Sequence, residues 1–253
     1  MSETGRRIPF LSAEELPAIR EQILDLKPHW VPRHPRGIYY TLGASNYWDL
    51  VCKSQGEYRS EAHRLNAILW ERFTPLYQNL KRVLAEALAA PVVYDPDVAL
   101  PGFHVFQGNS LLTDLRNVTH NQWFRERDEP DQFINAIHCD TPHLCVKFGP
   151  HGIDKTKPLS FTGAISLPRA GSGLFTWDMT RDEGQSIPDE QLLDALSHVA
   201  KTYHPYNAGE IFMHGGLVYH QIARLENLLP GEERITLQGH LVLRDDGRWV
   251  PYW

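Results

Sequence analysis

The sequence predicts a mainly β protein with flanking helices, whose core is a barrel or a double-sheet jelly roll. Short runs rich in β-branched and aromatic residues follow one another beyond residue 101, and Gly, Pro, Asn and Asp separate them. Many short strands at modest spacing are typical of such closed or double-sheet architectures. Before that point, apolar residues recur at helical spacing. We therefore expect one continuous domain, 1–253, in which 1–100 is a largely helical support and 101–253 is the β core.

Two helical segments are predicted before residue 101. The first begins near Ser12, where a capping box precedes apolar residues at helical spacing. The second begins near Glu61, and its apolar face continues past Pro75 to Leu88. Because proline removes a helical hydrogen bond, we expect a long helix interrupted at Pro75, or two helices in succession.

Beyond residue 101 the predicted strands are short, and one helix interrupts them. That helix, at about 188–206, opens at Pro188 and carries its leucines on one face. The predicted strands are Phe103–Phe106, Phe133–His138, Leu144–Phe148, Leu159–Leu167, Gly173–Trp177, Glu210–Met213, Leu217–Ile222, Arg234–Leu243 and Trp249–Trp253.

Composition argues against several classes of function. The net charge is −6 and no cluster of Lys or Arg stands out, so a nucleic acid is not expected as a partner. No apolar run approaches the roughly 18 residues of a membrane span, and the first residues do not resemble a signal peptide. Three cysteines are too few for a disulfide framework, which favours a reducing compartment. We expect a cytoplasmic protein that does not contact membranes.

The 13 histidines make a metal site worth seeking, and the sharpest candidate is Ile137-His138-Cys139-Asp140. Residues i and i+2 of a strand point to the same face, so His138 and Asp140 can converge on one metal ion. They would be two of the three ligands of a facial 2-His-1-carboxylate site, which leaves positions open for Fe(II) chemistry. Alone, the same two residues also fit a simple hydrogen-bonded pair.

Two histidines compete for the third ligand position. His220 lies in an alternating apolar run after a Gly-Gly turn, whereas His214 ends the preceding run at the turn itself. A strand holds a ligand more rigidly than a turn does, so we choose His220. His143 follows Pro142 without the ligand spacing of a structural zinc site, and we interpret it as a packing or supporting histidine.

A cationic and a hydroxyl side chain follow on a later run. Arg234 and Thr236 share one strand face by the same alternation. A guanidinium beside a hydroxyl suits a terminal carboxylate, which accepts a forked pair of hydrogen bonds and one more. The alternative is a surface Arg at the start of an edge strand. Gln107, at the end of the first core strand, is either a further contact to cosubstrate or substrate, or a plain turn amide.

In this order and spacing the motifs resemble those of the Fe(II)/2-oxoglutarate-dependent dioxygenases, which have a double-stranded β-helix (jelly-roll) fold. The resemblance spans about Phe103 to Leu243, and Ser172 stands where the family often has Gly. It rests on His138-Cys-Asp140, Ala170-Gly-Ser-Gly-Leu-Phe-Thr-Trp177, Gly209-Glu-Ile-Phe212 through His220, and Arg234-Ile-Thr236.

The resemblance implies an Fe(II) ion held by His138, Asp140 and His220, with 2-oxoglutarate bound through Arg234 and Thr236. It also implies that dioxygen and 2-oxoglutarate are consumed to give succinate and CO2 while a substrate is oxidised, for example by hydroxylation. Modest size, acidic charge and the lack of a peptide- or nucleic-acid-binding module favour a small-molecule substrate, such as an amino acid or secondary metabolite.

Two other functions stay open at this point. A cupin-like metal enzyme that does not use 2-oxoglutarate predicts an Arg234 that does not face the metal. A non-catalytic jelly-roll binding module predicts histidines that merely pack. An alternative assignment takes His214 as the third ligand and Arg224 as the carboxylate-binding residue. Arg224 has no hydroxyl residue two places after it, and no predicted strand follows it as one follows Arg234.

Overall fold

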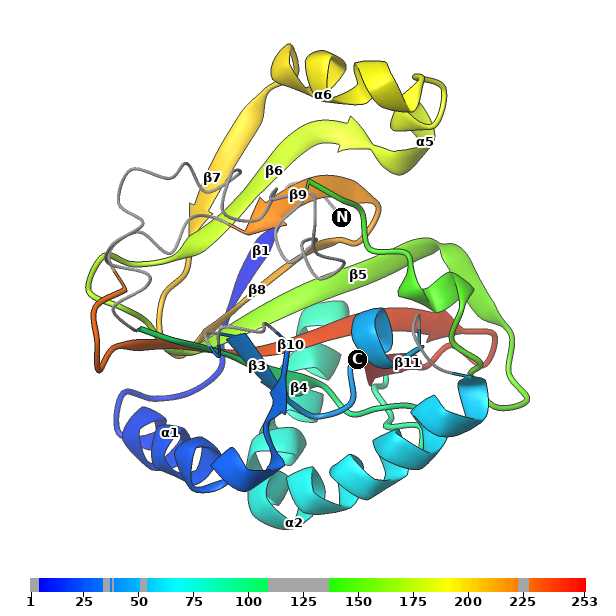
Figure 1. Ribbon diagram of the computed structural model, residues 1–253. Coiled ribbons are helices and arrows are strands. Elements are labelled where there is room, and N and C mark those ends of the chain that lie inside the picture. Colours follow the sequence, from blue (N-terminus) through cyan, green and yellow to red (C-terminus); the bar gives the residue numbers. More distant parts are fainter. Residues whose placement is uncertain (1–4, 34–36, 38, 51–53, 109–136, 223–227) are drawn as a thin grey trace.

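The strands form two antiparallel sheets that face each other (Figure 1). This computed structural model describes residues 5–33, 37, 39–50, 54–108, 137–222 and 228–253. The strands are β1 (Arg6–Pro9), β2 (Val31–Pro32), β3 (Tyr39–Leu42), β4 (Gly102–Gln107), β5 (Ile153–Ser166), β6 (Gly173–Thr180), β7 (Lys201–Pro205), β8 (Glu210–Gly215), β9 (Val218–Ile222), β10 (Glu233–Arg244) and β11 (Trp249–Tyr252). The larger sheet has the order β1-β8-β5-β10-β4-β3-β2, with β11 paired to β10, and the smaller sheet has the order β7-β6-β9.

Consecutive strands cross between the two sheets. β4 and β5 lie in the larger sheet, β6 and β7 lie in the smaller one, and β8, β9 and β10 then pass from larger to smaller and back. An isolated bridge joins His138, between β4 and β5, to His220 on β9, so this segment lies at the smaller sheet. Two facing antiparallel sheets connected in this way form a jelly roll. The predicted mainly β class and jelly-roll core are confirmed.

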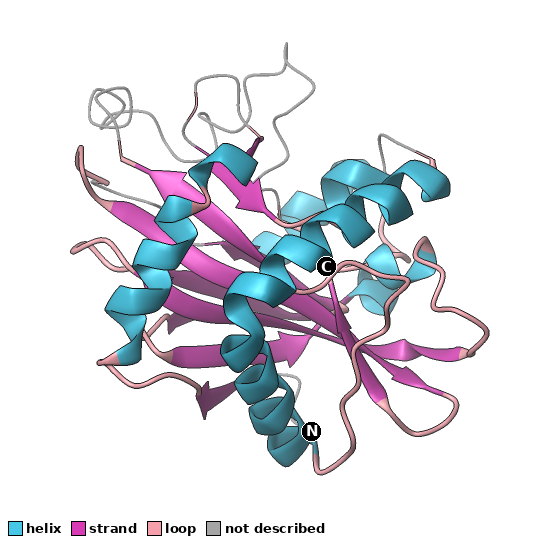
Figure 2. Cartoon of the chain, turned by 90° about the horizontal axis from the view of Figure 1, so that it is seen from below, coloured by secondary structure: helices cyan, strands magenta, loops and turns pink. Residues whose placement is uncertain are grey.

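Helices α1 (Glu15–Asp25) and α2 (Gln55–Leu88) cover the outer face of the larger sheet (Figure 2). The outer face of the smaller sheet packs against α6 (Asp189–Ser197), through contacts that include Trp177 and Leu196. Among the described residues, none of the helices has the length and apolarity needed to cross a membrane. The remaining helical segments are η1 (Lys27–His29), the π-helical turn η2 (Asn46–Leu50), η3 (Pro142–Leu144) and α5 (Arg181–Gly184).

Helix α2 passes through Pro75 as one bent helix. It starts with a capping box at Ser54 and ends at Ala89, which has a positive φ of 50°. The bend is at Phe73, whose φ of −124° and ψ of 24° leave the helical region two residues before the proline. A proline kink of this kind accounts for the predicted interruption.

Several predicted boundaries are wrong. The N-terminal part adds strands to the larger sheet, since β1 pairs with β8 and β3 pairs with β4. The helix expected over 188–206 is shorter, because α6 is followed by β7. Leu144–Phe148 is not a strand, because Pro142 starts the 3-10 turn η3. Most of the expected strand Phe133–His138 lies outside the described residues, and the division at residue 100 stays a prediction.

Strand β10 positions the site because its two faces differ. Ile235, Leu237 and Leu241 are buried in the apolar core beneath the helices. The residues that alternate with them point to the space between the sheets. These inner-face residues are Arg234, Thr236, Gln238 and His240, and their cross-strand neighbours include His104, Ser160 and Thr162. The interior of the jelly roll is therefore rich in hydrogen-bonding groups.

Candidate active site

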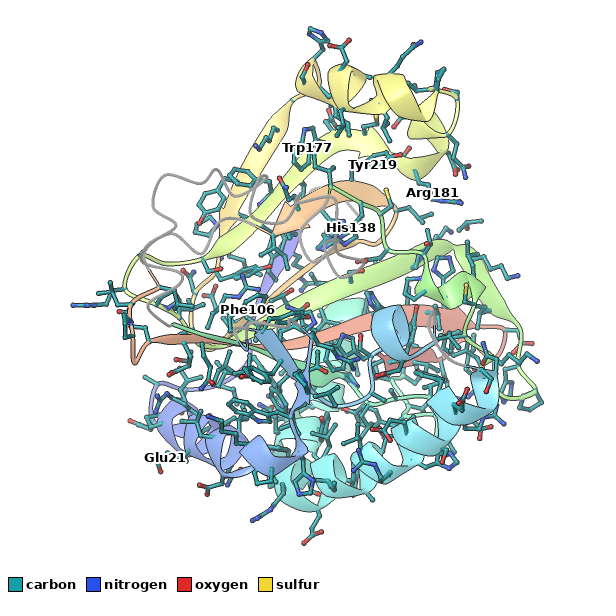
Figure 3. The ribbon with its side chains drawn as sticks, in the orientation of Figure 1. Glu21, Phe106, His138, Trp177, Arg181 and Tyr219 are labelled. Atoms are coloured by element: carbon teal, nitrogen blue, oxygen red, sulfur yellow. The ribbon has the colours of Figure 1, made fainter. Side chains whose placement is uncertain are left out.

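Two histidines face each other where the segment before β5 meets β9. The backbone N–H of His138 donates to the carbonyl of His220 at 3.0 Å, and the reverse hydrogen bond spans 2.9 Å. The two imidazole ring centroids lie 4.4 Å apart. Figure 3 shows His138 between the smaller sheet above and the larger sheet below. Backbone pairing thus fixes the separation of two predicted ligands.

Asp140 completes the cluster. Its backbone N–H donates to the carbonyl of Gly216 at 2.7 Å, in the turn between β8 and β9. Its Oδ1 lies 3.6 Å from Nε2 of His138, and its Oδ2 lies 3.3 Å from Nε2 of His220. One potential ligand atom from each of the three residues lies within 4.8 Å of the others. The structure therefore brings together the three residues chosen as ligands.

Hydrogen bonding and burial orient this cluster. Nδ1–H of His220 donates to the carbonyl of Val218 at 2.8 Å, so that Nε2 is the ring nitrogen that faces Asp140. Metal-ligating histidines usually donate their second ring N–H in this way. The side chains of His220 and Asp140 are 5% and 6% exposed, whereas that of His138 is 36% exposed. The cluster is thus accessible from the side of His138.

The charges of the cluster favour a bound cation. Burial raises the pKa of Asp140, but the charges of His220 and His240 and the hydrogen bond with His220 outweigh it, so the pKa lies well below its usual range. Burial lowers the pKa of His220, and the charge of Asp140 outweighs this effect and raises it. A metal ion can replace the protons that such imidazoles otherwise hold beside an ionised carboxylate.

Ser160 and His240 support Asp140 from the larger sheet. Oγ of Ser160 donates to Oδ2 of Asp140 at 2.5 Å and lies 3.1 Å from Nδ1 of His240. Nδ1 of His240 lies 3.6 Å from the same carboxylate oxygen. The sequence prediction missed both residues. The alternation that selected Arg234 and Thr236 also places His240 on the inner face, so a signal for His240 was present.

His214 lies in the same interior but outside the cluster. It faces Ser160 across β8 and β5, and its ring centroid is 4.6 Å from that of His220. Burial, together with the charge of His220, lowers the pKa of His214 to about 3. Within the described part of the chain, the cluster that fits a metal includes His220 and leaves out His214. His143 is buried, and its Nε2 lies 3.2 Å from the carbonyl of Lys155.

Arg234 is a fully buried cation near the start of β10. Nη1 donates to Oγ of Ser172 at 3.2 Å, and the guanidinium carbon lies 4.5 Å from the centroid of the Phe106 ring. Nε and Nη2 are buried and have no hydrogen-bond partner among the residues that the structure describes. A buried guanidinium with unused donors is costly unless an anion pairs with it. This position therefore fits a carboxylate ligand, and Ser172, which replaces the usual Gly, contacts its cation.

Thr236 lies two residues further along the same face and is fully buried. Nε2 of Gln238 donates to its Oγ1 at 3.0 Å. A hydroxyl that accepts one hydrogen bond still has its own proton to donate. Thr236 can therefore donate to a ligand that Arg234 binds.

Gln107 is not brought together with these two residues. In the pairing of β4 with β10 it lies opposite Glu233, one place from the pair formed by Phe106 and Arg234. Because side chains alternate between faces along a strand, Gln107 belongs to the outer face with Glu233. Glu233 there accepts hydrogen bonds from Arg20 at 2.5 Å and 2.9 Å. The position gives no support to Gln107 as a contact of the cosubstrate.

No protein-family model and no curated protein matches the sequence. The resemblance does extend to solved structures. An N-substituted L-amino acid dioxygenase from Burkholderia ambifaria AMMD, in complex with α-ketoglutarate (2-oxoglutarate), is 17% identical, with 100% of each chain covered and a TM-score of 0.49. HygX from Streptomyces hygroscopicus, with nickel, 2-oxoglutarate and hygromycin B bound, is 11% identical, with 94% of this chain and 82% of HygX covered and a TM-score of 0.48.

A third similar structure is SnoK, a non-haem α-ketoglutarate-dependent carbocyclase from nogalamycin biosynthesis. It is 12% identical, with 96% of this chain and 80% of SnoK covered and a TM-score of 0.47. What the present chain does has to follow from its own residues.

Proposed function

We propose that the protein is a non-haem Fe(II)/2-oxoglutarate-dependent oxygenase that oxidises a small molecule, for example by hydroxylation. The observation that supports this most directly is the buried Arg234 with unused donors, on the inner surface that also carries the His138–Asp140–His220 cluster. Either feature alone fits other proteins. A metal-ligand cluster and an unpaired guanidinium in one interior fit an enzyme that binds both a metal ion and a dicarboxylate.

The donor atoms fit both groups. Two imidazoles and one carboxylate on one side of an ion leave its other positions open, which is the ligand set of non-haem Fe(II) oxygenases. The unused nitrogens of Arg234, Nε and Nη2, form one edge of the guanidinium, and that edge binds both oxygens of a carboxylate. Thr236 offers a further donor on the same face.

The chain itself holds, orients and shields the reacting groups. When bound, iron and 2-oxoglutarate supply the dioxygen chemistry that yields succinate and CO2 and oxidises the substrate. His138, Asp140 and His220 would hold the ion, and Ser160 fixes the Asp140 carboxylate by its hydrogen bond. Arg234 would bind the distal carboxylate of 2-oxoglutarate, and the buried interior limits the access of water.

Substitution of the ligands separates a metal site from histidines that only pack. We expect His138→Ala, Asp140→Ala and His220→Ala each to abolish both Fe(II)-dependent succinate formation and the rise in melting temperature that Mn²⁺ gives, while the circular dichroism spectrum stays native. His214→Ala is the matched control from the same interior and should keep both. Metal binding that survives His220→Ala and is lost in His214→Ala would show that the third ligand is wrong.

The ligands can also be tested without a known substrate. Mn²⁺ and 2-oxoglutarate together should raise the melting temperature more than Mn²⁺ alone, because both bind only the folded protein. Stabilisation by metal without any further effect of 2-oxoglutarate would indicate a cupin-like enzyme. No stabilisation by metal would indicate a binding module. Succinate formation above the background rate, measured across a panel of small molecules, then identifies the substrate.

A further inference from the structure

A second group of buried polar atoms has no partner. Ser45 is fully buried and Asn46 is 1% exposed. Oγ of Ser45 and both polar atoms of the Asn46 amide make no hydrogen bond with any residue that the structure describes. Buried side-chain amides almost always have partners, because an unpaired donor or acceptor has lost its hydrogen bonds with water. A wholly unpaired amide therefore indicates a partner that the described residues do not supply.

A buried ion pair holds these residues against the larger sheet. The backbone N–H of Ser45 donates to Oδ2 of Asp49 at 2.9 Å. Asp49 accepts hydrogen bonds from Nη1 and Nη2 of Arg33 at 3.1 Å and 2.7 Å, and Nε of Arg33 donates to Thr41 on β3 at 2.9 Å. Asn46 begins η2, and π-helical turns are frequent at functional sites. The charges of Arg33 and Asp49 pair with each other. The unpaired groups beside them, a hydroxyl and an amide, are uncharged.

His104 lies between the strand that precedes this turn and the strand that carries Arg234 and Thr236. In the larger sheet it lies between Thr41 on β3 and Thr236 on β10. Its Nδ1 is buried without a partner in the described structure, although the residue as a whole is half-buried. Burial and the charges of Arg234 and Arg33 hold the pKa of His104 well below its usual range, so the ring is neutral. Because His104 pairs with Thr236, its side chain lies on the inner face of the sheet.

We propose that Asn46, Ser45 and His104 recognise the substrate of this same site, and that they bind an uncharged group of carboxamide type. Two parallel hydrogen bonds with a carboxamide satisfy both atoms of the Asn46 amide at once. A carboxylate has no donor for Oδ1 of Asn46, and an ammonium group has no acceptor for its Nδ2. Ser45 and His104 each offer one further hydrogen bond. That the bound carboxamide belongs to a substrate rests on the proposed function, whereas carboxamide binding itself can be tested independently of that function.

Propionamide and propionate are probes of nearly equal shape that differ in the required donor. With Zn²⁺ and 2-oxoglutarate present, we expect propionamide to bind the wild-type protein in a saturation-transfer NMR experiment and propionate not to bind. Asn46→Leu keeps the branched shape and removes both polar atoms, so it should weaken propionamide binding at least about tenfold. Equal binding of the two probes, no binding of propionamide, or unchanged binding by Asn46→Leu would overturn the proposal.

Melting temperatures without ligand give an independent readout. Asn46→Leu should melt a few degrees higher than the wild type, because it removes unpaired buried atoms. Asn66→Leu is the matched control and should melt lower, because the amide of Asn66 bonds the carbonyl of Val98 at 2.9 Å and the N–H of Leu100 at 2.8 Å. A fall for Asn46→Leu like that of Asn66→Leu would show that ordered water satisfies the amide, and would overturn the proposal.

A second variant and a separate binding assay keep the test decisive. If Asn46→Leu does not fold, Ser45→Ala removes one unpaired hydroxyl and should weaken propionamide binding several-fold. Unchanged binding by Ser45→Ala would then count against the proposal. The stabilisation given by Zn²⁺ with 2-oxoglutarate should be intact in both variants. Its loss in the wild type would overturn the proposed function, whereas absent propionamide binding beside an intact stabilisation overturns this inference alone.

Discussion

Because two donors of Arg234 are unused, we expect Arg234→Met to stabilise the ligand-free protein and to reduce the stabilisation by 2-oxoglutarate. Arg234→Met keeps most of the side-chain volume and removes the charge. Without ligand, two unpaired buried donors disappear, and each costs about 1–3 kcal/mol. The lost contact with Phe106 offsets about 1 kcal/mol of that gain, and the lost hydrogen bond with Ser172 offsets about 2 kcal/mol more. With each donor taken at the middle of its range, we expect the free energy of unfolding of the ligand-free protein to rise by about 1 kcal/mol.

With 2-oxoglutarate the same substitution should be harmful. A charge-assisted hydrogen bond contributes about 1.5–3 kcal/mol, so loss of the forked pair should weaken binding by at least about 3 kcal/mol, or roughly 100-fold. At about 100 times its Kd, 2-oxoglutarate stabilises the wild type by about 2.7 kcal/mol. At that concentration Arg234→Met would retain only about 0.4 kcal/mol.

Urea denaturation with Zn²⁺ present, with and without 2-oxoglutarate, measures both effects. Arg20→Met is the control, because Arg20 pairs with Glu233 on the opposite face of the sheet, next to Arg234 in sequence. It should leave the stabilisation by 2-oxoglutarate unchanged. Full stabilisation in Arg234→Met, or a ligand-free loss as large as the about 3–5 kcal/mol of a broken buried ion pair, would refute the reasoning.

Two further substitutions test the support of the site and of the fold. Ser160→Ala removes the hydrogen bond that holds Asp140, so we expect Mn²⁺ affinity to fall about 10–100-fold by calorimetry; an unchanged affinity would contradict this role. Tyr58→Phe removes the buried hydroxyl that donates to the carbonyl of Trp253 at 2.9 Å, so the free energy of unfolding in urea should fall by about 1–3 kcal/mol. Equal urea midpoints for Tyr58→Phe and the wild type would show that this hydrogen bond is dispensable.

Residues that depend on local alternation could be predicted from the sequence. Arg234 and Thr236 are two residues apart on β10, so the strand period decides their shared face. His138 and Asp140 were chosen by the same spacing, although only an isolated bridge at His138 forms there. Ser160 could not be found in this way, because it meets Asp140 only when β5 pairs with the strands around it. The unpaired amide of Asn46 has no sequence signal either, since the absence of a partner is a property of the folded chain.

The same limit applies to the secondary structure. The longer inner strands were predicted because apolar and polar residues alternate along them. β1, at one edge of the larger sheet, and β3, next to the edge strand β2, are four residues each and exist through pairing with strands far along the chain. β7 begins soon after the leucine-rich helix α6 and has a polar sequence. The prediction therefore extended that helix over β7. In η3, Pro142 overrides the β-favouring residues that follow it.

The two faces of β10 make its register a requirement for both folding and ligand binding. A slip of one residue would move the guanidinium of Arg234 under the helices and turn Ile235 and Leu237 towards the metal ligands. No partly functional intermediate lies between these two arrangements, so a single insertion or deletion within β10 removes stability and activity together. The turn after it, 245–248, tolerates changes in length better than the strand does, because its residues are exposed and follow the last residue pair of the sheet. Natural variation in length should therefore collect in that turn and avoid the strand.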